Sequence, residues 1–162
     1  MKNKYFLIIL NVLLLFTFSD ALSQSGKVPP FQMTLHDGRP FKAQNLPPGK
    51  HIIIVYFSPE CEDCHEFITA MLEHINDFQN SSIAMITYMP VDKVKPYVLN
   101  NKLDKYPNIY TGTEGNSLYV ANYYNIRLFP FVALFDKNGN PVKKYTSTEI
   151  NLEDLISRLK NL

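Results

Sequence analysis

Residues 52–64, IIIVYFSPECEDC, join an apolar run to a pair of cysteines. The run at residues 52–57 is unbroken, which is typical of a strand covered on both faces of a sheet. From Cys64 onward, apolar residues recur at helical spacing. These residues are Phe67, Ile68, Met71, Leu72, Ile75 and Phe78. The pattern predicts a buried strand that leads into a helix, with Cys61 and Cys64 where the helix begins.

Strand-like and helix-like segments alternate along the rest of the chain. Hairpins are predicted around the Asp37-Gly38 and Asn138-Gly139 turns. Between and after them the patterns predict strands at 82–89, 107–112 and 131–136, and helices at 91–103 (with Pro96 near its start), 116–126 and 151–162 (with Asn151 as its cap). This order predicts one α/β layered domain with a mixed sheet.

Composition excludes some classes of protein. The chain has 162 residues, 46% of them hydrophobic, which suits one core plus an extension. Its 16 Lys and Arg residues against 15 Asp and Glu residues leave a net charge of +1, without a basic cluster that would neutralise a row of phosphates. Nucleic acid is therefore not expected as a partner.

The first residues have the pattern of a targeting segment. Lys2 and Lys4 precede an apolar run at 5–18, and Ala21 and Ser23 sit two apart as a signal-peptidase site requires. We expect a signal peptide at 1–23 and a mature domain at 24–162. The run is shorter than the roughly 20 residues that span a bilayer, so a retained anchor is the secondary reading. The segment has no cysteine for a lipid anchor.

The only two cysteines, Cys61 and Cys64, stand three apart. In an exported protein they can form a disulfide, but closing so short a loop stabilises a fold by only about 2 kcal/mol. A redox role suits them better. A thiol at a helix N-terminus is favoured as thiolate, so Cys61 is expected to attack a substrate disulfide and Cys64 to resolve the mixed disulfide.

The string CEDCH allows two other interpretations. Both thiols could tether a haem with His65 as iron ligand, but the α/β context and the placement of His65 on the solvent side of its helix argue against it. A zinc site needs four ligands, and the missing ones would come from histidines at irregular spacing; Cu(I) on the two thiolates is chemically possible. We expect no metal and no bound cofactor, because the dithiol itself carries both electrons.

Three stretches together resemble one family: PPFQMTLHDGRPF at 29–41, the cysteine segment at 52–64, and YYNIRLFPFVALFDKNGNPV at 123–142. In this order they resemble the thioredoxin superfamily, specifically its exported TlpA/ResA-like, AhpC/TSA-related branch of thiol-disulfide oxidoreductases. The resemblance implies a thioredoxin-like three-layer sandwich, in which helices flank a mixed sheet, with an N-terminal β-hairpin and an inserted strand and helix.

The resemblance also implies roles for single residues. Pro130 matches the cis-proline that faces the dithiol in the family, and the backbone of Phe129 matches the segment that pairs with bound polypeptide. Val55 and Phe67 stand where some members carry a carboxylate, so proton transfer cannot be copied from them. Glu66 is a candidate substitute base, against the plainer reading of a solvated carboxylate in the first turn.

The acidic residues around Cys61 give the expected direction of the reaction. Carboxylates at 60, 62 and 63 disfavour a thiolate, which makes the couple more reducing. We expect an exported, monomeric protein disulfide reductase of the periplasm or cell exterior, active in redox homeostasis there. The resemblance implies a membrane thiol-disulfide relay as electron donor and disulfide-containing envelope proteins, apocytochromes among them, as substrates.

Two alternatives remain at this point. Ser58 stands three residues before Cys61, as in the Thr/Ser-x-x-Cys motif of peroxiredoxins, although Ile54 replaces the proline expected before that motif. A thiol peroxidase is therefore one alternative. The other is a metal-binding or interaction module that keeps the fold without turnover, since fold alone does not determine function.

Overall fold

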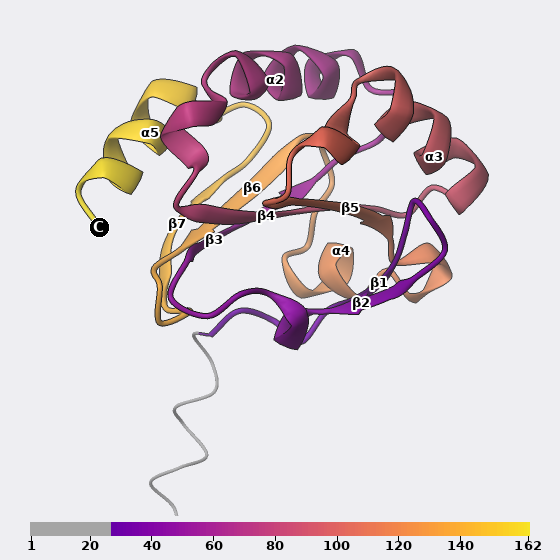
Figure 1. Cartoon of the computed structure of the whole chain (residues 1–162), viewed down its shortest axis with the longest axis horizontal. Helices are drawn as coiled ribbons and strands as arrows, with labels where there is room; N and C mark the ends of the chain where they lie inside the picture. The colour runs from indigo at the N-terminus through magenta and orange to yellow at the C-terminus, as the bar shows by residue number, and fades with distance from the viewer. Residues whose placement is uncertain (1–26) are drawn as a thin grey trace, which may run out of the picture.

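The structure is a computed structural model that describes residues 27–162 (Figure 1). The predicted signal peptide at 1–23 lies outside the described residues. Among residues 27–162, no helix combines the length and the apolar character needed to cross a membrane.

Seven strands form one mixed sheet in the order β2-β1-β5-β4-β3-β6-β7. Their bounds are Gln32–Leu35 (β1), Pro40–Lys42 (β2), His51–Tyr56 (β3), Ser81–Thr87 (β4), Ile109–Thr113 (β5), Phe131–Phe135 (β6) and Pro141–Tyr145 (β7). The central strands β3, β4 and β5 run parallel, and β1 and β6 join them antiparallel. The predicted α/β class, with its mixed sheet and N-terminal hairpin, is confirmed.

Helices cover both faces of the sheet (Figure 1). On one face lie α2 (Glu62–Glu73), α3 (Val91–Asn100) and α5 (Leu152–Lys160), and on the other lies α4 (Tyr119–Tyr123). Short 3₁₀ turns complete the chain at Ala43–Asn45, Ile75–Phe78, Leu103–Lys105 and Gly115–Ser117. After His51, strand β3 is apolar because its alternate side chains fill two cores: Ile53 and Val55 face α2, and Ile54 and Tyr56 face α4.

Both predicted hairpins are present. Strand β1 pairs with β2, and β6 with β7, each antiparallel. Gly38 and Gly139 adopt positive φ (89° and 77°), which glycine does without steric cost. In the second turn, Oδ1 of Asp136 accepts hydrogen bonds from the backbone N–H groups of Asn138 and Asn140, both at 2.8 Å.

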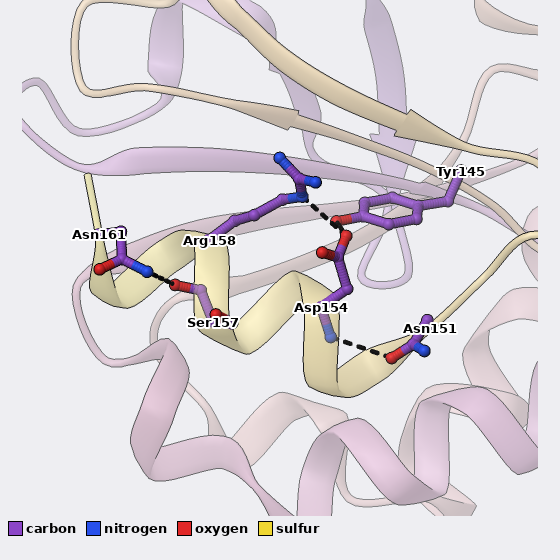
Figure 2. Close-up of polar contacts among 6 residues, drawn as sticks. All are labelled: Tyr145, Asn151, Asp154, Ser157, Arg158 and Asn161. Carbon is purple, nitrogen blue, oxygen red and sulfur yellow. Dashed lines mark hydrogen bonds and ion pairs between the residues drawn. The ribbon is translucent and has the colours of Figure 1, made fainter.

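Helix α5 is capped and fastened to β7 by side chains (Figure 2). Oδ1 of Asn151 accepts from the backbone N–H of Asp154 (2.9 Å), so the predicted cap is confirmed. Oδ2 of Asp154 accepts from Nε of Arg158 and from the hydroxyl of Tyr145, both at 2.7 Å. The Arg158 guanidinium, followed by the Tyr145 hydroxyl, lowers the pKa of Asp154. At the other end, Asn161 donates to the carbonyl of Ser157 (2.7 Å).

Some predicted bounds were wrong. The helix expected at 116–126 contains only Tyr119–Tyr123, because Leu118 before it and Asn125 after it take left-handed conformations. The strand expected at 82–89 ends at Thr87, whose hydroxyl accepts the N–H of Met89. Pro96 is the sixth residue of α3 and not near its start. Pro96 is exposed, so water can bond to the carbonyl that it leaves without a partner.

Strands β1 and β5 approach closely at Gly112, and the Gly112→Ala variant tests this contact. An added Cβ would lie 2.5 Å from the carbonyl oxygen of Thr34 in β1. Since backbone must then shift, we expect the free energy of unfolding to fall by about 2 kcal/mol, measured by urea denaturation. Gln32→Ala, at an exposed β1 position, is the control. An unchanged urea midpoint for Gly112→Ala would contradict the close contact.

Candidate active site

The two cysteines lie at the beginning of α2, as the sequence predicts. Cys61 is the N-cap residue of the helix, and its sulfur accepts a hydrogen bond from the backbone N–H of Cys64 (3.2 Å). The two are joined by a disulfide, with their Cα atoms 5.2 Å apart. Cys61 is half-buried, whereas Cys64 is 0% exposed. An incoming thiol can therefore reach the sulfur of Cys61 more readily than that of Cys64.

The segment between β3 and α2 is held by backbone contacts. The N–H of Phe57 donates to the carbonyl of Ile86 in β4 (3.0 Å), which extends the strand pairing by one residue. The carbonyl of Ser58 accepts the N–H of Cys61 (3.1 Å), and the hydroxyl of Ser58 accepts the N–H of Glu60 (3.3 Å). The buried strand thus fixes where the first sulfur stands.

His65, directly after Cys64, supports the same segment. Its Nε2–H donates to the carbonyl oxygen of Pro59 (2.8 Å), and its ring lies 5.1 Å from the ring of Tyr97 in α3. The side chain is half-buried and not on the fully solvated face that the helical pattern predicts. As an iron ligand, His65 would have to give up the bond to Pro59 or turn its other nitrogen toward the metal.

Acidic side chains surround the dithiol. Glu60, Glu62, Asp63 and Glu66 are all exposed. Glu60 forms an ion pair with Lys93 of α3 (3.4 Å) in which both side chains are more than half exposed, so the pair is worth little energetically. Within residues 27–162, Glu62 and Asp63 pair with no cation.

Glu66, the candidate base, faces solvent. It helps to line a shallow hollow of about 500 Å³ along α2, together with Glu62, His65 and Glu73. Among the described residues, no hydrogen bond joins Glu66 to either cysteine. Its role in proton transfer stays a prediction, and the solvated carboxylate is the simpler interpretation of its position.

The loop before β6 brings an aromatic group to this end of the sheet. The peptide bond between Phe129 and Pro130 is cis. The half-buried ring of Phe129 lies 5.8 Å from that of Tyr56 in β3 and 5.9 Å from that of Tyr88, which follows β4. Phe129 also packs against the buried cluster that contains Cys64. Leu128 beside it is 61% exposed, which leaves apolar surface for a bound chain.

The core beneath the dithiol is apolar, at Val55 and Phe67 as elsewhere. We call the buried cluster on the α2 side of the sheet the dithiol core; it includes Val55, Phe57, Cys64, Phe67 and Tyr97.

Across residues 27–162, no group of three or more His, Cys, Asp or Glu side chains is arranged to hold a metal ion.

Sequence reasoning missed two buried polar side chains near the site. The hydroxyl of Tyr56 donates to Oε1 of Glu114 (2.6 Å). The same carboxylate accepts from the N–H of Ala121 at Oε1 (3.3 Å) and from the N–H of Val120 at Oε2 (2.7 Å). The hydroxyl of Tyr97 is buried without a partner among the described residues, and burial raises the pKa of Tyr97 to about 12. For Tyr56, a tyrosine in an otherwise apolar run was the available signal. Tyr97 stands in a segment that also holds lysines, a proline and asparagines, so no such signal marks it.

Comparison with known families and structures confirms the predicted thioredoxin-like fold. A family model described as thioredoxin-like domain matches residues 42–162. A search of curated proteins finds no significant match.

Solved structures share the fold at low sequence identity. A secreted disulfide oxidoreductase of Mycobacterium tuberculosis, described as homologous to DsbE of E. coli, has a TM-score of 0.66 and 17% identity, covering 82% of this chain and 96% of its own. A thiol-disulfide oxidoreductase from Bacteroides fragilis has a TM-score of 0.63 and 16% identity, and the match covers 83% of this chain and 98% of its own. ScoI of Arabidopsis thaliana with copper bound has a TM-score of 0.63 and 18% identity, and the match covers 81% of this chain and 94% of its own. At these identities the likeness shows the fold.

Proposed function

Because the chain belongs to the thioredoxin-like family, we propose that it is a thiol-disulfide reductase of protein disulfides. The observation that carries the proposal is the arrangement of the two sulfurs: half-buried Cys61 caps the N-terminus of α2, and buried Cys64 lies within disulfide reach of it. A reachable nucleophile with a shielded partner one turn away is what exchange through a mixed disulfide requires.

The reaction follows from this arrangement. In the reduced protein, the Cys61 thiolate attacks a substrate disulfide, forms a mixed disulfide and releases one substrate thiolate, which takes up a proton. The Cys64 thiolate then attacks the sulfur of Cys61 and releases the second substrate thiolate. Two electrons pass to the substrate, and the Cys61–Cys64 disulfide of the structure is the oxidised product. An external dithiol must reduce it again.

The acidic surroundings support the reductase direction. Glu62 and Asp63 lie in the first turn of α2 and repel a thiolate at Cys61, which opposes the helix dipole. A less stable thiolate means a less stable reduced form and a lower reduction potential. Equilibration with thiol buffers should give a value near that of thioredoxin, about −270 mV; a value near −120 mV would indicate an oxidant and refute the reductase role.

Neutralising these charges tests the explanation. In the double variant Glu62→Gln, Asp63→Asn, we expect the equilibrium between dithiol and disulfide to shift three- to tenfold toward the dithiol, which raises the potential by about 15–30 mV. The effect should shrink at high salt, because exposed charges are screened. Glu73→Gln, at the exposed far end of α2, is the matched control and should leave the potential unchanged. A potential that does not rise would refute the electrostatic argument.

For substrate binding we propose the loop before β6. The backbone of Phe129 would pair with an extended polypeptide beside Cys61, and Pro130 would keep the loop in register. The exposed Leu128 and the rings of Phe129 and Tyr88 offer apolar contacts to a flexible substrate. Glu66 stays the proposed route for protons on the solvent side.

We further propose that the protein acts outside the cytoplasm after export, as a monomer of the TlpA/ResA-like branch. Its electrons would come from a membrane thiol-disulfide relay, and its substrates would be disulfide-containing envelope proteins such as apocytochromes. The signal-like segment at 1–23 and the three resembling stretches support this. Fractionation of cells that express the full chain, with N-terminal sequencing of the product, tests both export and cleavage.

Insulin reduction with dithiothreitol as donor separates the proposal from its alternatives. The reductase should accelerate insulin precipitation. Peroxide consumption without any protein disulfide partner would instead favour a thiol peroxidase, and stoichiometric Cu(I) binding without insulin reduction would favour a metal-binding module. Either result would overturn the reductase assignment.

A further inference from the structure

His65 joins helix α2 to the turn that carries Cys61. Residues 58–61 form this turn, which is closed by a hydrogen bond from the N–H of Cys61 to the carbonyl of Ser58 (3.1 Å). Pro59 stands at the second position of the turn, a place that suits its fixed φ. The carbonyl oxygen of Pro59 takes no part in closing the turn and instead accepts from Nε2–H of His65 (2.8 Å). A side chain near the start of the helix thus fastens the turn that precedes it.

The disulfide and the His65 bond are the two polar or covalent links that side chains of α2 make to this turn among residues 27–162. Reduction breaks the first link, because it separates the sulfurs of Cys61 and Cys64. The second link involves no sulfur and can persist in both redox forms. An ion pair between the turn and α3 is exposed and adds little. In the reduced protein, His65 is therefore the side chain of α2 that still holds the turn.

The two links enclose the same stretch of chain. The bond between Pro59 and His65 spans the residues that the Cys61–Cys64 disulfide closes into a ring. Ordering a segment costs conformational entropy, and a second link across a segment that is already ordered costs less. The disulfide therefore strengthens the His65 bond, and by thermodynamic reciprocity the bond favours formation of the disulfide to the same extent.

Packing holds the imidazole in place for this contact. His65 is half-buried, and its ring lies 5.1 Å from that of Tyr97 in α3. Its own backbone N–H donates to the carbonyl of Cys61 (3.2 Å), so the backbone and the side chain of one residue bind two carbonyls of the turn. A side chain whose rotamer is restricted by packing can hold a neighbouring segment in a defined position.

We propose that His65 is a positioning residue that keeps Cys61 beside Cys64 after the disulfide is reduced. The proposal rests on the thiol-disulfide exchange proposed above and concerns its second step. There the Cys64 thiolate attacks the sulfur of Cys61, a new S–S bond forms between them, and the substrate sulfur leaves with the electron pair of the broken bond. His65 gives up no proton in this step. By holding the turn against α2, it raises the effective concentration of the attacking thiolate at the sulfur of Cys61.

The His65→Phe variant tests this role, because it keeps a ring beside Tyr97 and removes the N–H donor. We expect the equilibrium of the Cys61–Cys64 couple with glutathione to shift about three- to tenfold toward the dithiol, which raises the potential by about 15–30 mV. Release of glutathione from its mixed disulfide with Cys61 should slow by a similar factor. The urea midpoint of the oxidised form should fall more than that of the reduced form, because the bond is stronger when the disulfide is present. His65→Ala gives the same test if the phenylalanine variant does not fold.

Two control variants separate the hydrogen bond from other effects. His65→Gln loses the ring but keeps an amide N–H of similar reach, so it should recover most of the wild-type potential. His74→Phe makes the same replacement at the opposite end of α2, where the imidazole is exposed and does not contact the turn. This variant should leave the potential unchanged.

Three results would overturn the assignment. Equal losses of stability in both redox forms, with an unchanged potential, would show a purely structural role for His65. A shift toward the disulfide would show that the ring acts through a positive charge that stabilises the thiolate. A His65→Gln variant that shifts as far as His65→Phe would show that the donated bond is not the cause.

The experiment separates this proposal from the proposed function. Insulin reduction by the wild-type protein reports the function, whereas the glutathione equilibrium reports only the Cys61–Cys64 couple. The expected shift in His65→Phe without insulin reduction by the wild type would keep the positioning role and refute the reductase. Insulin reduction without a shift would do the reverse.

Discussion

Replacing Cys61 by serine is expected to lower the rate of insulin reduction by roughly a thousandfold or more, because the variant lacks the sulfur that attacks the substrate. The loss should not come from unfolding. A disulfide that closes so short a loop contributes only about 2 kcal/mol. Urea denaturation of the variant and of the reduced wild type should therefore give similar midpoints. Residual activity of the variant above a few per cent would contradict the assignment of Cys61 as nucleophile.

The Cys64→Ser variant should fail at a different step. It keeps Cys61 and so forms the mixed disulfide, but no second sulfur remains to release it. We expect a covalent adduct between Cys61 and a substrate cysteine, seen on non-reducing gels and by mass spectrometry and removed by dithiothreitol. The double variant Cys61→Ser, Cys64→Ser is the control and should trap nothing. Adducts formed by Cys61→Ser instead would reverse the two roles.

The fold was predictable wherever local pattern and burial agree. The apolar run at 52–57 has no polar face, and a strand with that pattern fits only between two layers of helices; the structure confirms this for β3. The hairpin glycines and the Asn151 cap are likewise local signals that no tertiary contact opposes. The position of the two cysteines at the start of α2 followed from these elements.

Contacts between distant segments were not predictable. Helix α4 is shorter than its apolar pattern suggests because Leu118 takes a left-handed conformation. Glu114, 58 positions from its partner Tyr56, then bonds the N–H groups that open the helix. The half-buried place of His65 likewise depends on α3, which packs Tyr97 against it. Periodicity within one segment carries no information about such partners.

The roles of the candidate site residues are a separate matter from their positions. The structure packs Phe129 against the core that contains Cys64, and Pro130 follows it through a cis peptide bond, but polypeptide binding there stays a prediction. The same holds for proton transfer by Glu66, whose exposed position offers no contact that distinguishes a base from a solvated carboxylate. The substitutions of Cys61 and Cys64 above concern the sulfur chemistry and leave these two roles to substrate-binding experiments.

Glu114 is where we expect the largest loss of stability. Glu114 is only 8% exposed, and its carboxylate accepts hydrogen bonds from the Tyr56 hydroxyl and from two N–H groups of α4. In Glu114→Leu, these donors stay in the core without an acceptor, and each unpaired group costs about 1–3 kcal/mol. We expect the free energy of unfolding to fall by about 3 kcal/mol or more, measured by urea denaturation. Glu153→Leu, at an exposed position of α5, is the control.

A double-mutant cycle identifies the cause. If the cost comes from the stranded Tyr56 hydroxyl, then Tyr56→Phe should be less harmful beside Glu114→Leu than alone, with a coupling of about 1 kcal/mol or more. Glu114→Gln keeps an acceptor oxygen and should lose less stability. It replaces Glu114→Leu in the cycle if the leucine variant does not fold. Purely additive effects would show that the bond contributes nothing. Helix α4 leads into the Phe129–Pro130 loop, and the ring of Tyr56 packs on that of Phe129. Variants of Glu114 or Tyr56 that still fold should therefore bind polypeptide substrates less tightly, while the reduction potential of Cys61–Cys64 stays unchanged.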